Sequence, residues 1–113
     1  MASFDRIDEV QPSPKFGNTG PEGWGFTLWG SPTCAEEVHR GLLDAFFREH
    51  PDCRLQLPPA FDGEDLIEGS MVWRGVPVWV WFETVLNHTW LWSPDQACSL
   101  DLRRAILPLA ENA

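Results

Sequence analysis

Alternating apolar and polar residues predict two adjacent strands in the second half of the chain. LIEGSMVW (66–73) and VPVWVWFETVL (76–86) both follow the two-residue period of a strand, and Arg74-Gly75 between them has the length of a tight hairpin turn. HTWLW (88–92) follows with the same character, and WGFTLWG (24–30) resembles them earlier in the chain. The pattern predicts four strands in a mostly antiparallel sheet.

A helix is expected after the first strand. Thr33 and Glu36 have the spacing of a capping box, in which two side chains satisfy free amides at a helix start. Apolar residues such as Val38 and Leu42 then recur at helical spacing until Pro51, which should stop the helix.

A second helix is expected at the end of the chain. Ser93-Pro94 should open it, with the proline in the first turn and Gln96 at the capping-box position. Pro108 should end it, because proline lacks the amide hydrogen that helix interiors require.

The segment before the first strand, residues 1–23, carries Pro12, Pro14 and Pro21 among polar residues, which predicts an irregular Pro/Gly-rich N-terminal arm. A chain of 113 residues fits a single domain. We therefore expect an α+β two-layer sandwich in the order β-α-β-β-β-α. Its mostly antiparallel four-stranded sheet should carry the two helices on one face.

The two turns decide where the side chains of the sheet point. A turn at Arg74-Gly75 places Ser70 opposite Trp79, and a turn at Asn87-His88 places Glu83 opposite Trp92. One face is then almost wholly apolar: Met71, Trp73, Val78, Val80, Phe82, Thr84, Leu86 and Leu91. The other face mixes four indoles with two carboxylates: Glu68, Ser70, Val72, Trp79, Trp81, Glu83, Val85, Trp90 and Trp92. A one-residue slip at either turn would exchange the faces.

The mixed face needs an explanation. Four half-exposed indoles would present about 300–500 Å² of apolar surface, and patches of that size on monomers are usually functional. Three covers remain open: residues 1–23 folding back over the face, a second copy of the chain in a homodimer, or a different protein.

Charge narrows the choice of partner. Seventeen acidic residues against eight basic ones give a net charge of −9, which disfavours nucleic acid and anionic membrane surfaces and favours a basic protein. The alternative is that acidity serves solubility alone. FDGEDLIE (61–68) adds four carboxylates without a base: Asp62, Glu64, Asp65 and Glu68. These would steer a basic partner, unless the segment is simply a solvated loop. A calcium site at the first three lacks the EF-hand order.

Catalytic interpretations have less support. Cys34 in a first helical turn, the histidines at 39, 50 and 88, and the carboxylates of Glu68 and Glu83 are chemically competent, but no spacing brings them together. Cys34, Cys53 and Cys98 lack metal-ligand spacing and indicate reduced thiols. With no secretory signal, apolar span, phosphate loop or cofactor motif, we expect a cytoplasmic protein that is not an enzyme and binds no cofactor or metal.

A small, acidic, lysine-poor α+β chain rich in aromatic residues resembles the immunity proteins of bacterial polymorphic toxin systems. The resemblance lies in the general character of the whole chain and brings no motif residues with it. It implies a stoichiometric inhibitor that binds a toxin domain, often a basic nuclease, and blocks its active site or substrate surface. Small acidic phage inhibitors of host defence share this character.

The face argument names the expected partner-binding residues. The aromatic surface is Trp79, Trp81, Glu83, Trp90 and Trp92, and the electrostatic surface is Asp62, Glu64, Asp65 and Glu68. Two alternatives from other classes remain: a carbohydrate-binding module that stacks sugars on the same tryptophans, and a small hydrolase or transferase using Cys34 or Glu83.

Overall fold

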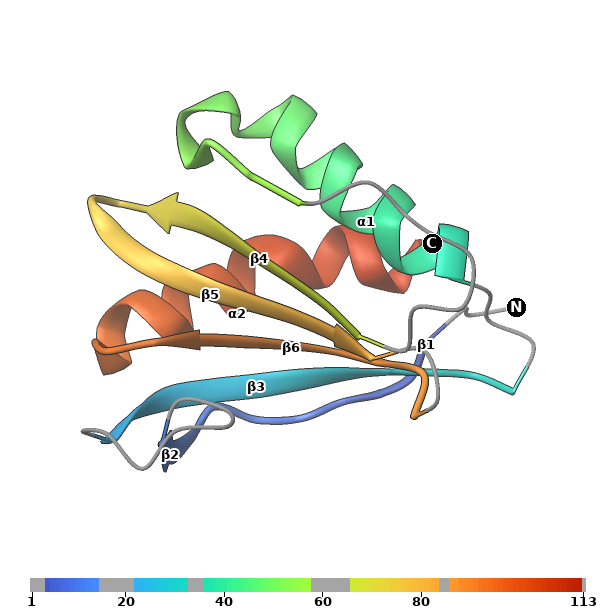
Figure 1. Ribbon diagram of the computed structural model, residues 1–113, viewed down its shortest axis with the longest axis horizontal. Coiled ribbons are helices and arrows are strands. Elements are labelled where there is room, and N and C mark those ends of the chain that lie inside the picture. The colour runs from blue at the N-terminus through green and yellow to red at the C-terminus, as the bar shows by residue number, and fades with distance from the viewer. Residues whose placement is uncertain (1–3, 15–21, 33–35, 58–65, 84–85, 113) are drawn as a thin grey trace.

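The computed structural model describes residues 4–14, 22–32, 36–57, 66–83 and 86–112. In chain order its elements are β1 (Phe4–Ile7), β2 (Gln11–Pro14), β3 (Glu22–Gly30), α1 (Glu36–Glu49), the 3-10 helix η1 (Pro51–Cys53), β4 (Leu66–Trp73), β5 (Val76–Glu83), β6 (His88–Ser93) and α2 (Gln96–Glu111). The strands form one antiparallel sheet in the order β1-β3-β6-β5-β4, with β2 also paired to β3. The two helices lie next to each other on one side of the sheet (Figure 1).

The sequence predicts the α+β class, the antiparallel pairing and the two helices, but the expected four-stranded sheet is wrong. Two further strands, β1 and β2, lie in the segment predicted to be irregular, and they pair with opposite halves of β3. Pro12 and Pro14 argue against a central strand, yet an edge strand tolerates proline because its outer side needs no amide donor. The same prolines leave this edge of the sheet poorly suited to pairing with another chain.

The hairpin between β4 and β5 forms as predicted. Arg74 and Gly75 both have positive φ, 50° and 80°, as a type I′ turn requires. Trp73 pairs with Val76 and Ser70 with Trp79. This turn matches the right-handed twist of the two strands.

The connection between β5 and β6 is longer than predicted. Glu83 pairs with His88, not with Trp92, so the predicted partner is wrong by four residues. β5 ends at Glu83, and Leu86 is 53% exposed rather than part of the core. Thr84 and Val85 lie outside the described residues. Because the error is an even number of residues, the described side chains within β5 and β6 keep their predicted faces.

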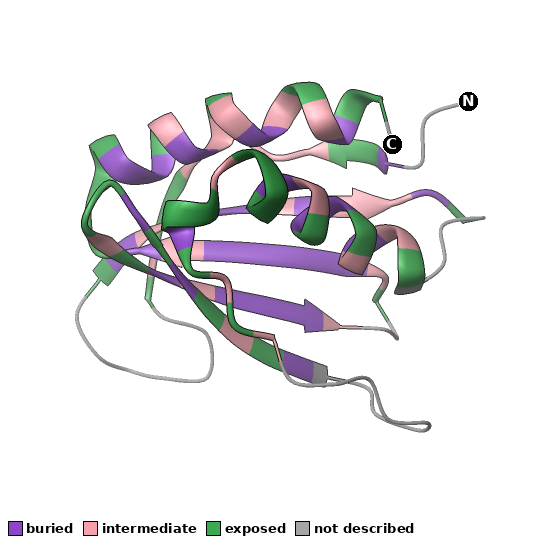
Figure 2. Ribbon diagram, turned by 90° about the horizontal axis from the view of Figure 1, so that it is seen from above, coloured by how far each residue is buried: buried purple, intermediate pink, exposed green. Residues whose placement is uncertain are grey.

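The core lies between the apolar face of the sheet and the two helices. The helices contribute residues at helical spacing, such as Leu42 and Phe46 of α1 and Leu102 and Ile106 of α2, all 4% exposed or less. The sheet contributes Phe26, Leu28, Met71, Trp73, Val78, Val80 and Leu91. In Figure 2 the central strands are largely buried, while both helices carry exposed residues on their outer sides.

The helix ends differ in part from the predicted ones. α1 ends at Glu49, before Pro51 as expected, whereas Thr33 lies outside the described residues. The N-cap of α2 is Asp95, whose carboxylate accepts the Cys98 amide, so the predicted start at Ser93-Pro94 is wrong. α2 also continues past Pro108, which is exposed in the last turn and removes a single hydrogen bond there. Neither described helix is long and apolar enough to cross a membrane.

Candidate functional site

The face of the sheet opposite the helices carries the four tryptophans that the sequence places together. The register pairs Trp79 with Trp92 and Trp81 with Trp90, and opposed residues of antiparallel strands share a face. We call these four side chains the tryptophan face. Its position away from α1 and α2 agrees with the prediction.

Two glycines of β3 leave room for the indoles of β6 to pack against the sheet. A Cβ atom at Gly23 would collide with the Trp92 ring and lie 2.6 Å from the Ser93 carbonyl oxygen. At Gly25 it would lie 2.8 Å from Nε1 of Trp90. The two indoles therefore occupy the space that side chains of the neighbouring strand would otherwise fill.

The tryptophan face is accordingly less exposed than predicted. Trp81 and Trp90 are only 8% and 9% exposed, while Trp79 and Trp92 are half-buried. Trp92 also donates a hydrogen bond from Nε1 to the Ser13 carbonyl oxygen at 2.8 Å, so β2 contacts the edge of this face. The estimate of apolar area, which assumed half exposure for all four rings, is therefore too large for Trp81 and Trp90.

The exposed part of this side of the molecule follows the edge strand β4. Glu68, Ser70 and Val72 are exposed and stand opposite Trp81, Trp79 and Pro77 in the register. Val72 is 37% exposed, a high value for a strand valine beside an indole. We call Glu68, Ser70, Val72 and the half-buried Trp79 the β4 strip. It combines a carboxylate, a hydroxyl, an aliphatic side chain and an aromatic ring.

At the other end of the same face, a row of ionisable and aromatic side chains runs across the sheet. Glu83, His88, Trp29 and Arg6 are successive register partners across β5, β6, β3 and β1. Oε2 of Glu83 lies 3.8 Å from Nε2 of His88, whose ring packs edge-on against Trp29. Burial lowers the pKa of His88 below its usual 6.5, and the nearby Glu83 carboxylate offsets part of that effect.

The structure brings together only part of the predicted site. The four tryptophans, Glu68 and Glu83 lie on one face of the sheet. Asp62, Glu64 and Asp65 lie outside the described residues, as does Cys34. His88 was not predicted as a neighbour of Glu83, because the expected turn placed Trp92 there. The role of the two glycines was not predicted either, since it follows only from a register that sets Gly25 against Trp92.

His39, one of the candidate bases, belongs to a buried structural network. Asn87 donates from Nδ2 to the Ser31 carbonyl oxygen at 2.9 Å, so its Oδ1 faces His39 Nε2 at 2.8 Å. His39 must therefore donate from Nε2 and accept at Nδ1 from the Thr89 hydroxyl, 2.7 Å away. Burial lowers the pKa of His39, in keeping with a neutral ring. The network ties α1 to the connection between β5 and β6.

A shallow pocket of about 330 Å³ lies between η1 and the turn at Arg74-Gly75. Its wall includes His50, whose ring packs against Phe46 and Trp73. Arg74 is also in the wall, but its guanidinium is bonded to Asp101. In the described parts of the chain, no three His, Cys, Asp or Glu side chains gather as a metal site. Cys53 also lines the pocket and is 2% exposed.

Cys53 and Cys98 should resist alkylation at pH 7 in the native protein. They are 2% and 5% exposed, and burial raises the pKa of both thiols, so little thiolate is present. Iodoacetamide labelling with peptide mass mapping should find both unmodified in buffer and both modified in urea. Rapid labelling of either in the native state would contradict this placement.

No protein-family model matches the sequence, and comparison with curated proteins and with solved structures finds no significant similarity.

Proposed function

We propose that the chain is a non-enzymatic inhibitor that binds a basic protein through the β4 strip, as an immunity protein does when it neutralises a toxin. The main support for this proposal is the composition and exposure of the β4 strip. Val72 and the half-buried Trp79 give an apolar centre beside the exposed carboxylate of Glu68. Half-buried tryptophans that lose their remaining water on docking often dominate the energy of an interface.

Charge supports a basic partner. The sequence carries a net charge of −9, and its long-range field speeds encounter with a positively charged surface. A toxin domain that acts on nucleic acid presents such a surface, because it must bind phosphates. Blocking that surface would inhibit the toxin without any chemistry by the inhibitor.

The geometry favours protein docking over the other two functions. Sugar stacking needs an exposed ring face, and only Trp79 and Trp92 of the tryptophan face keep substantial exposure. Catalysis needs a base near a substrate cleft, whereas His39 is buried in its own network. The proposal therefore includes no cofactor and no catalytic residue.

Glu68→Lys should weaken binding to the toxin domain by at least about tenfold, or about 1.4 kcal/mol. The substitution replaces attraction by repulsion at the β4 strip, and the loss should shrink as salt rises. The measurement is co-expression with the product of the neighbouring gene, followed by size-exclusion chromatography and titration of the purified pair. Glu111→Lys makes the same charge change at an exposed position in the last turn of α2 and should bind nearly as wild type.

Trp79→Ala in the same assay tests the apolar centre of the strip, and circular dichroism should show both strip variants to be folded. Equal affinity for wild type, Glu68→Lys and Trp79→Ala would place the interface elsewhere. If no complex forms, a sugar panel monitored by tryptophan fluorescence becomes the decisive comparison. Salt-independent quenching by one sugar would replace the inhibitor proposal with the carbohydrate-binding one.

A further inference from the structure

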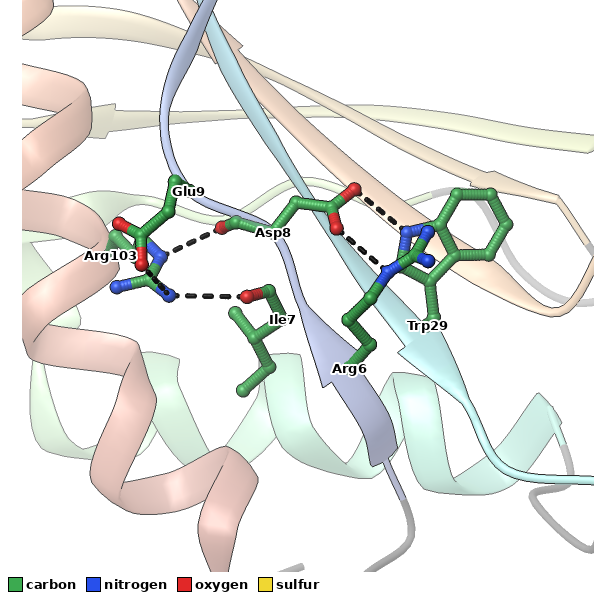
Figure 3. A network of polar contacts seen from close by, with 6 residues as sticks. All are labelled: Arg6, Ile7, Asp8, Glu9, Trp29 and Arg103. Atoms are coloured by element: carbon green, nitrogen blue, oxygen red, sulfur yellow. Dashed lines mark hydrogen bonds and ion pairs between the residues drawn. The ribbon is translucent and has the colours of Figure 1, made fainter.

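The chain uses the same three-group arrangement twice. In the first, Arg6 Nε lies 2.8 Å from one carboxylate oxygen of Asp8, while Trp29 Nε1 donates to the other oxygen at 2.8 Å. The Arg6 guanidinium also stands over the Trp29 ring, 5.0 Å from its centroid. Figure 3 shows the carboxylate of Asp8 joined by dashed lines to both the arginine and the indole. The Asp8 carboxylate and the Trp29 ring thus both contact the Arg6 guanidinium.

The second instance lies at the other end of the sheet. Trp73 Nε1 donates to Asp101 Oδ2 at 2.9 Å, and Arg74 forms an ion pair with the same oxygen. The Arg74 guanidinium stands 5.3 Å from the centroid of the Trp73 ring. The hydrogen-bonded pair with Arg74 lowers the pKa of Asp101 most, and the hydrogen bond from Trp73 lowers it further. A planar, weakly hydrated guanidinium suits this arrangement better than an ammonium group does.

Glu83 is a third carboxylate that lies near a tryptophan, although this indole does not donate to it in the way that Trp29 and Trp73 donate to their carboxylates. It follows Trp81 by two residues on β5, so both side chains are on the same face. Its side chain is 24% exposed, and its ionic contact is with His88 at 3.8 Å. Among the described residues, no arginine or lysine lies within ion-pair distance of Glu83. His88 is therefore the partner of this half-buried carboxylate in the described parts of the chain.

His88 is a second, independent sign of an incomplete site. Its side chain is 8% exposed, and neither ring nitrogen has a hydrogen-bond partner within the described part of the chain. Buried polar atoms are nearly always bonded in folded proteins, so such an exception requires a reason. Nε2 faces the Glu83 carboxylate, and a small approach would let a neutral ring donate to it. The carboxylate would then be oriented but would keep its charge.

We propose that Glu83 and His88 form the binding site for one arginine side chain of the partner, with Trp81 beside it. This inference rests on the proposed function, since the arginine would come from the basic protein that docks on the β4 strip. Glu83 accepts hydrogen bonds from the guanidinium, and His88 holds the carboxylate in place. Glu68, opposite Trp81 in the register, adds a second acidic group on the same face of the sheet. The nearby Arg6 is committed to Asp8.

Arginine binding should weaken as pH falls below about 6.5. Protonated His88 would neutralise Glu83 from within the chain and compete with the incoming cation. The titratable and charged groups near His88 are Glu83 from β5, the neutral His39 on the helix side of the sheet, and the Arg6–Asp8 pair around Trp29. The charges of Arg6 and Asp8 cancel. Glu83 is therefore the charged group whose attraction for a guanidinium falls when His88 is protonated.

The test uses acetyl-arginine methylamide as the probe, with the neutral isostere acetyl-citrulline methylamide as its control. NMR of the wild-type chain in low-salt buffer at pH 7 should show saturable shifts of the His88 ring and the Trp81 indole, with a dissociation constant on the order of 10 mM. The citrulline control should produce no saturable shifts. Arginine should also lower the pKa of His88 measured by NMR. Glu83→Gln should reduce binding about tenfold or more, whereas Glu111→Gln should leave it unchanged.

Equal shifts with arginine and citrulline, or full binding by folded Glu83→Gln, would overturn the proposed site. If Glu83→Gln does not fold, the comparison of arginine with citrulline on the wild type decides alone. The probe contains no protein partner, so this result is separate from the docking assay. Arginine binding without a toxin complex would refute the inhibitor proposal and support the cation site. A toxin complex without arginine binding would support the inhibitor proposal and refute the cation site.

Discussion

Gly23→Ala should destabilise the protein by about 3 kcal/mol, more than a surface substitution normally does. The added methyl group would collide with the Trp92 ring and lie 2.6 Å from a backbone oxygen of β6. The ring can move only by giving up its hydrogen bond to Ser13, and the backbone oxygen belongs to the paired strand. Urea unfolding monitored by tryptophan fluorescence would measure the loss.

Gly41→Ala is the matched control, because it adds the same atom where nothing lies within 4 Å. Gly41 lies inside α1 and is exposed, so alanine should stabilise the helix by about 0.5–1 kcal/mol. Opposite signs for the two substitutions are expected. A Gly23→Ala protein as stable as wild type would mean that Trp92 does not rest against β3.

Acidification from pH 7 to pH 5 should lower the free energy of unfolding. Burial lowers the pKa of both His39 and His88 in the folded state. The unfolded chain therefore takes up protons first, beginning near the ordinary value of 6.5. Stability is complete above that pH and falls below it, by up to about 1.4 kcal/mol per pH unit for each histidine.

Urea midpoints at several pH values would measure this slope. His39→Gln should lower the overall stability, because it disturbs the bonds to Thr89 and Asn87, but it should also make the pH dependence shallower. A wild-type midpoint that stays constant from pH 7 to pH 5 would show that the two rings are not held neutral. Asp101, whose pKa is lowered, should matter only at more acidic pH.

Local chemistry was sufficient to predict the hairpin between β4 and β5, but not the two ends of α2. The hairpin at Arg74-Gly75 was predicted to the residue because a two-residue loop fixes the register. The next connection was placed wrongly, since nothing in 84–87 distinguishes a short turn from a longer loop. The two faces were still assigned correctly, because the error was an even number of residues.

Features that depend on distant partners were not predictable. β1 and β2 are short and contain prolines, and they exist as strands because β3 offers a long edge. The exposure of the tryptophan face was overestimated, because its indoles lie over glycines from another strand. The Glu83–His88 pair needed the true register. The partner-binding role of the tryptophans and carboxylates stays a prediction.

The connection between the first and last parts of the chain also bears on how the protein is made. Arg103 of α2 donates to the backbone oxygens of Ile7 and Asp8, the latter 95 residues earlier in the sequence (Figure 3). β3, the second strand of the sheet, likewise pairs with β6, which follows it by more than 50 residues in the sequence. A ribosome must therefore release most of the chain before the early strands find their partners. Until then Trp24 and Trp29 are unprotected, so newly made chains should be the form most prone to aggregation.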